Sequence, residues 1–68
     1  MGKVKGVLYR FQDCQCPNIY GGLDTIPAGL YWVAELDVVS VAVGPRKLDL
    51  EKNAFNLLKA DGKATHMP

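Results

Sequence analysis

The segment from Gly29 to Val43, GLYWVAELDVVSVAV, constrains the fold of this chain more than any other part of the sequence. Valine and aromatic residues crowd it, and it lies between the turn-forming residues Pro27-Ala28-Gly29 and Gly44-Pro45. Branched and aromatic side chains pack well on a pleated surface, so this composition predicts β-structure. The segment is also the richest apolar stretch of the chain, and we expect it to form the centre of the core.

This apolar segment is longer than a typical strand of about five or six residues. Glu35 and Asp37 also interrupt one of its two alternating faces. We therefore expect a bulge or bend near these carboxylates that divides the segment into two strands, 30–35 and 38–43.

The residues before this segment predict one more strand and a long connection. Residues 3–12 alternate in the manner of a strand, with Val7, Tyr9 and Phe11 on one face. Residues 13–29 are dense in proline, glycine, asparagine and aspartate, which favour turns. We expect an irregular connection there, and connections of this length often carry function.

After the turn at Gly44-Pro45, the C-terminal third of the chain allows two interpretations. Residues 47–51 alternate like an edge strand, but residues 50–60 have the apolar spacing of an amphipathic helix. Asp49 is a suitable N-cap, and Gly62 lies where a left-handed C-terminal cap belongs. We favour a helix over 50–60, followed by a flexible tail over 63–68.

These elements predict a single small α+β domain with a mainly antiparallel sheet of three or four strands and one C-terminal helix. The alternative is a hairpin around Asp61-Gly62, a common turn dipeptide, which would give a small all-β barrel of the SH3 or OB type. The side chains expected in the core are Val7, Leu8, Phe11, Leu30, Trp32, Leu36, Val38, Val41, Phe55, Leu57 and Leu58.

Composition limits the classes of function. The chain has 68 residues and a formal net charge of +1, whereas proteins that bind duplex DNA usually carry a clear basic excess. It has no apolar run long enough to cross a membrane and no pattern of a secretion signal. With only two cysteines, a reducing intracellular and cytoplasmic setting is expected. A chain this short also gains stability from self-association or from a larger partner.

Residues that could carry chemistry are few. Cys14 and Cys16 supply two thiols, but a structural zinc site needs four ligands, and His66 lies far along the sequence. Glu35 and Asp37 would share one face of a strand, yet a chain of this size offers little room for an enclosing pocket. We predict that the protein is not an enzyme and has no catalytic residue, metal, cofactor or small-molecule substrate.

The leading functional hypothesis is a binding protein that docks on another protein, either a copy of itself or a partner, as small mobile-element (for example phage) accessory proteins do. Aromatic and charged side chains near the predicted turns and strand ends are the candidate contacts: Tyr20, Tyr31, Glu35 and Asp37.

The alternative hypothesis is single-stranded nucleic-acid binding by the first strand. Cations beside aromatic residues on a sheet can hold phosphates while unpaired bases stack. The candidate contacts for this function are Lys3, Lys5, Tyr9 and Arg10.

Overall fold

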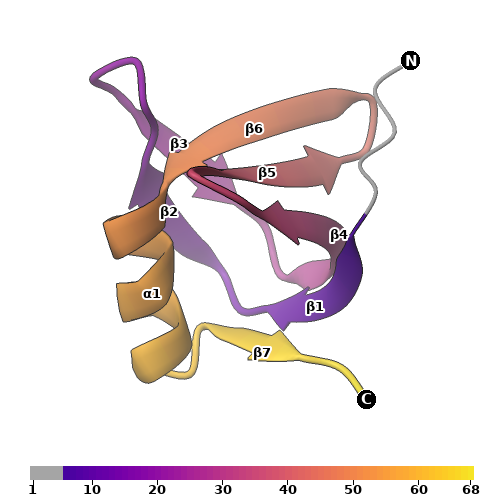
Figure 1. The fold of residues 1–68 in the computed structure, drawn as a ribbon. Coiled ribbons are helices and arrows are strands. Elements are labelled where there is room, and N and C mark those ends of the chain that lie inside the picture. The colour runs from indigo at the N-terminus through magenta and orange to yellow at the C-terminus, as the bar shows by residue number, and fades with distance from the viewer. Residues whose placement is uncertain (1–5) are drawn as a thin grey trace.

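The structure, a computed structural model, describes residues 6–68, which form seven strands and one helix (Figure 1). In chain order these are β1 (Val7–Phe11), β2 (Cys14–Pro17), β3 (Leu23–Ile26), β4 (Gly29–Glu35), β5 (Val38–Val43), β6 (Arg46–Glu51), α1 (Lys52–Ala60) and β7 (Ala64–His66).

The strands form two open antiparallel sheets. The larger sheet has five strands in the order β6-β5-β4-β1-β7, and the smaller one pairs β2 with β3. The α+β class and the antiparallel pairing are therefore confirmed. The expected number of strands was too low, and over residues 6–68 the sheets do not close into the alternative barrel.

The long apolar segment divides as its charges predicted. β4 ends at Glu35 and β5 begins at Val38, so the bend falls on Leu36 and Asp37. The next turn contains Gly44 with a φ of 62°, a left-handed conformation that glycine adopts readily and that two-residue hairpin loops require.

The inward face of β4 is the opposite of the one expected. Val33 is buried at 1% exposure, whereas Leu30 and Trp32 are 54% and 51% exposed. Trp32 pairs across the sheet with Leu8 on β1 and Ala42 on β5, and these neighbours share its outward face. The prediction that Leu30 and Trp32 belong to the core was wrong, because a strand's alternation defines two faces but not which of them is covered.

The rest of the expected core is confirmed only in part. Phe11, Val41, Phe55 and Leu58 are buried, but Leu36 and Leu57 are 71% and 66% exposed. Val7 is also exposed, and Leu8 and Val38 are half-buried. The observed core consists of Tyr9, Phe11, Cys16, Ile26, Val33, Val39, Val41, Leu48, Leu50, Phe55, Leu58 and Ala64.

Both interpretations of the C-terminal third apply, one after the other. Residues 46–51 form strand β6, and the helix begins at Lys52 with Glu51 as its N-cap and no side-chain cap from the expected Asp49. At the other end, Gly62 has a φ of 78° and donates its N–H to the carbonyl of Lys59, while Lys63 N–H donates to the carbonyl of Leu58. This pair of hydrogen bonds is a Schellman motif, as the position of Gly62 predicted.

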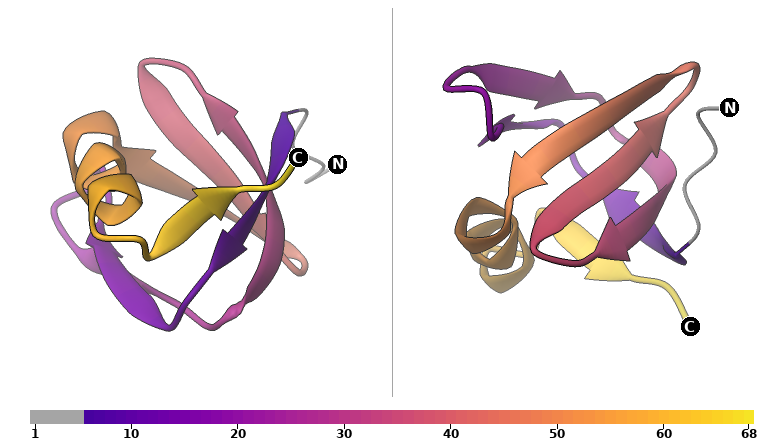
Figure 2. Two further views of the ribbon diagram at one scale, coloured as in Figure 1. Left: turned by 90° about the horizontal axis from the view of Figure 1, so that it is seen from below. Right: turned by 45° about the horizontal axis from the view of Figure 1, so that its top comes forward.

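Two segments expected to be irregular are strands. Most of the long connection forms the β2–β3 hairpin, which buries Cys16 and Ile26 against the core. The expected tail contains β7, which pairs with β1 and buries Ala64 beside α1 (Figure 2). Both segments gain order from tertiary contacts that local sequence does not encode.

Candidate binding surfaces

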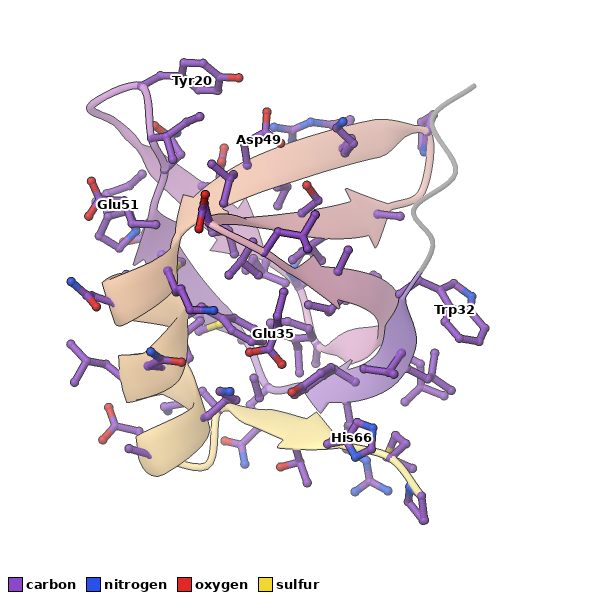
Figure 3. The ribbon with its side chains drawn as sticks, in the orientation of Figure 1. Tyr20, Trp32, Glu35, Asp49, Glu51 and His66 are labelled. Carbon is purple, nitrogen blue, oxygen red and sulfur yellow. The ribbon has the colours of Figure 1, made fainter. Side chains whose placement is uncertain are left out.

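The outer face of the large sheet carries an exposed apolar cluster with cations on both sides. Its side chains, which we call the Trp32 face, are Leu8 and Arg10 of β1, Leu30 and Trp32 of β4, and Lys47 of β6. All but the half-buried Leu8 are exposed, and Figure 3 shows the Trp32 indole projecting away from the sheet. A half-exposed tryptophan beside a half-exposed leucine is an unusual use of large apolar side chains.

Small residues surround Trp32 on its β5 side. Ala42 lies directly between Trp32 and Lys47 in the cross-strand register, and Ala34 and Ser40 form the neighbouring pair. Short side chains here leave one side of the indole open above the sheet.

The two charged side chains of the Trp32 face, Arg10 and Lys47, are both positive, and the carboxylates on the same side of β6, Asp49 and Glu51, lie farther from Trp32 in the register. Among the described residues the ion pairs join Arg46 to Asp24 and Lys59 to Glu35, so neither Arg10 nor Lys47 is neutralised by one. The acidic group nearest in the register is Asp49, which accepts a hydrogen bond from the hydroxyl of Tyr20 at 2.7 Å.

A second exposed apolar group lies on the β2–β3 hairpin. Its members, which we call the hairpin patch, are Pro17, Ile19, Tyr20 and Leu23, with Ile19, Tyr20 and Leu23 at 43%, 74% and 62% exposure. None of these four side chains is charged. Tyr20 extends from the tip of the hairpin, on a different part of the molecule from Trp32 (Figure 3).

Hydrogen bonds hold the hairpin loop in one conformation. The Asn18 side-chain oxygen accepts from the backbone N–H of Tyr20 at 2.9 Å and of Gly22 at 3.0 Å. Gly21 has a φ of 90°, and Ile19 N–H donates to the carbonyl of Asp49 on β6. The hydrogen bond that the Tyr20 hydroxyl donates to the Asp49 carboxylate raises the pKa of Tyr20. The patch is therefore presented on an ordered loop.

Only part of the expected nucleic-acid site can be placed. Lys3 and Lys5 lie outside the described residues. Arg10 is exposed on the Trp32 face, but Tyr9 points to the opposite side and is buried at 4% exposure. The Tyr9 ring packs edge-on against Phe55 at 5.3 Å, so no base can stack on it. The expectation that Tyr9 is a contact was wrong because the inward face of β1 is covered by α1.

Tyr9 instead belongs to a hydrogen-bonded chain that links sheet and helix. Its hydroxyl donates to Glu35 at 2.5 Å, and Lys59 of α1 donates to the other Glu35 oxygen at 2.8 Å. Burial, together with the bond to Glu35, raises the pKa of Tyr9 to about 12. Partial burial works to raise the pKa of Glu35, but the hydrogen bonds from Lys59 and Tyr9 outweigh it and hold that pKa below its ordinary value.

The expected protein contacts are dispersed. Tyr20 lies in the hairpin patch and Asp37 is exposed in the β4–β5 bend. Tyr31 is half-buried against Phe11, and its hydroxyl donates to the carbonyl of Pro27 at 2.7 Å. Glu35 is occupied by Tyr9 and Lys59. Of the four, Tyr20 alone lies within one of the two surfaces.

The two thiols lie on β2, Cys14 half-buried and Cys16 buried. Burial raises the pKa of both, and that of Cys16 to about 11. Within residues 6–68, no group of three or more His, Cys, Asp or Glu side chains could hold a metal ion. The helix of the described region is too short and too polar to span a membrane.

The sequence-based core prediction missed the exposed position of Leu30 and Trp32 because it assigned both to the core, and it gave Lys47 no role. The signal available was the pattern on the other face, where Tyr31 and Val33 of β4 are the same residue types as their cross-strand partners Tyr9 and Val7 of β1. Comparisons of this chain with protein-family models, curated proteins and solved structures find no match.

Proposed function

We propose that this chain is a non-enzymatic binding protein that docks on another protein through the hairpin patch. The observation that carries this proposal is the exposure of three large apolar side chains, Ile19, Tyr20 and Leu23, on one ordered hairpin. Apolar and aromatic side chains that are already ordered lose little conformational freedom on binding, and tyrosine often dominates the binding energy of interfaces.

The lack of charge on the patch favours a protein partner over an anionic polymer. A protein interface has an apolar centre depleted of charged residues, and the hairpin patch has that composition. The simplest partner is a second copy, because a chain of 68 residues buries only a modest share of its surface alone.

Light scattering of the purified chain tests this proposal. We expect a mass above that of one chain, falling to one chain for the double variant Tyr20→Ser, Leu23→Ser. Leu36→Ser is the matched control, since Leu36 is equally exposed but lies in the β4–β5 bend. A wild-type chain that stays monomeric and gains no partner in chemical cross-linking of its native extract would contradict protein docking.

A second candidate function is single-stranded nucleic-acid binding by the Trp32 face. The observation that favours it is the exposed indole of Trp32 between two cations, Arg10 and Lys47, that have no acidic partner within residues 6–68. Aromatic rings stack on unpaired bases, and cations on either side attract the phosphates.

Tryptophan fluorescence tests the second candidate directly, because the chain has one tryptophan. Stacking of a base on Trp32 is expected to quench its emission when a single-stranded oligonucleotide is added at low salt. Emission that does not change, together with no binding in a labelled-oligonucleotide titration, would rule out this candidate without affecting the proposal for the hairpin patch.

A further inference from the structure

We infer that a single strand bound to the Trp32 face crosses the β-strands, with different phosphates on Arg10 and Lys47 and one base stacked on Trp32 between them. This inference rests on the second candidate function. It specifies the path of the ligand, the number of phosphates that these two cations hold and the role of each side chain.

The order of the strands sets the path. Lys47 is two strands from Trp32 on the β6 side, in the same cross-strand row through Ala42. Arg10 is one strand from Trp32 on the β1 side and is displaced by two residues, opposite Leu30. With neighbouring strands about 4.8 Å apart, the two cations are separated by about three strand spacings, or roughly 14 Å across the sheet.

This separation assigns the two cations to different phosphates. Successive phosphates of one strand are about 3.4 Å apart along a duplex axis, and stretching a single strand increases that spacing without reaching the separation of the cations. The backbone must therefore pass at least one phosphate between Arg10 and Lys47. The nucleotide at this middle position lies over Trp32.

The surroundings of Trp32 leave space for a base. Ser40 and Ala42 on the β5 side and Ala34 on β4 itself are too short to cover the indole. Leu8 on the β1 side and Leu30 on β4 itself provide an apolar border. A base inserted there would stack on the ring, which requires that it be unpaired, so a duplex would lose this contact.

The salt dependence of binding tests the path. Fluorescence anisotropy of a labelled oligodeoxythymidylate, measured at several salt concentrations, gives the slope of log affinity against log salt. Each phosphate contact on a single strand contributes about 0.7 to the magnitude of that slope. We expect Arg10→Gln and Lys47→Gln each to lower the magnitude by about 0.7 and the double variant by about 1.4.

Trp32→Ala separates stacking from charge. It is expected to weaken binding by roughly 5- to 150-fold at every salt concentration while leaving the slope unchanged, since base stacking contributes about 1–3 kcal/mol. Lys52→Gln is the control for overall charge, because Lys52 is exposed on α1 and its side chain donates to the carbonyl of Leu36, away from the Trp32 face. It should leave slope and affinity nearly unchanged.

The outcomes distinguish the proposed path of the strand from the second candidate function on which it rests. Binding by the wild type with an unchanged slope in Arg10→Gln and Lys47→Gln would overturn the proposed path while the second candidate function survives. Binding of duplex as tight as single strand, or unaltered binding by Trp32→Ala, would overturn the stacking role. No binding by the wild type would overturn both. All four substituted side chains are exposed, so the variants are expected to keep the core intact, which urea unfolding checks.

Discussion

At the scale of single residues, Glu35 shows how a charged side chain is accommodated on the inner face of this sheet. The Tyr9 hydroxyl and the Lys59 ammonium each donate to one of its oxygens. Both partners favour the carboxylate over the protonated acid, and this is why the pKa of Glu35 lies below its ordinary value despite partial burial. The interaction joins β1, β4 and α1 through one side chain.

Glu35→Gln is therefore expected to destabilise the fold by about 1 kcal/mol at neutral pH, a value reduced because the group is partly exposed. A folded-state pKa below the unfolded one stabilises the fold above the unfolded pKa, and this contribution is lost as the pH falls through the folded pKa. The difference between wild type and variant in urea unfolding should thus shrink toward acid pH. A difference that stays constant down to pH about 3 would contradict this assignment. Asp37→Asn, at an exposed carboxylate in the bend, is the control.

The two thiols are expected to differ in reactivity because only thiolates are good nucleophiles. Cys16 is buried with its pKa raised to about 11, whereas Cys14 is half-buried. Under native conditions an alkylating reagent should label Cys14 first and Cys16 only after urea is added. Mass spectrometry of peptides from a time course measures both rates, and equal native rates would show that Cys16 is not protected.

At the scale of elements, β4 is central to the architecture because one of its faces is buried in the core and the other is exposed. Val33 packs into the core on one side, and Trp32 lies on the other side with its indole half-exposed. The neighbouring strands β1 and β5 repeat this division, with Tyr9 and Val41 inward and Leu8 and Ala42 outward. The covered face is the one that also meets the helix.

Adjacent substitutions in β4 should therefore have very different effects on stability. Val33→Ala removes buried methyl groups and is expected to cost about 2 kcal/mol. Trp32→Ala removes a larger side chain but is expected to cost less than about 1 kcal/mol, because half of the indole is already in water. Urea unfolding of the two variants gives the comparison, and a larger loss for Trp32→Ala would place the indole in the core after all.

At the scale of the whole molecule, the short strand β7 connects the helix to the large sheet, since it contacts α1 and pairs with β1. The chain leaves α1 through the Schellman motif at Gly62 and returns antiparallel to β1 (Figure 2). Ala64 is then buried at 3% exposure in the core, and the His66 ring lies 5.4 Å from that of Tyr9. A region that looks polar in sequence thus completes the five-stranded sheet.

Truncation tests the contribution of β7. A chain ending at Lys63 lacks the strand and uncovers part of β1, so it is expected to lose at least about 2 kcal/mol of stability. A chain ending at His66 keeps the strand and is the matched control. Circular dichroism during urea unfolding measures both, and equal stability of the two chains would show that β7 adds nothing to the fold.

The sequence by itself determined those features that depend on local physical chemistry. The strands on either side of Leu36-Asp37, the glycine at Gly44 and the helix end at Gly62 all follow from side-chain preference and backbone freedom. The buried Phe11, Val41, Phe55 and Leu58 follow from apolar spacing. Each of these signals is contained within a few neighbouring residues.

Only the tertiary structure decided which face of β4 is covered, and with it the position of the candidate site. Alternation gives two equivalent choices, and the choice depends on elements that come later in the chain. α1 packs on the side of Tyr9, and β7 joins the sheet beside β1 and buries Ala64 on that side. That packing turns Trp32 and Arg10 outward together and buries Tyr9. The same long-range pairing orders β2, β3 and β7, because a strand gains its hydrogen bonds from a partner that local sequence does not specify.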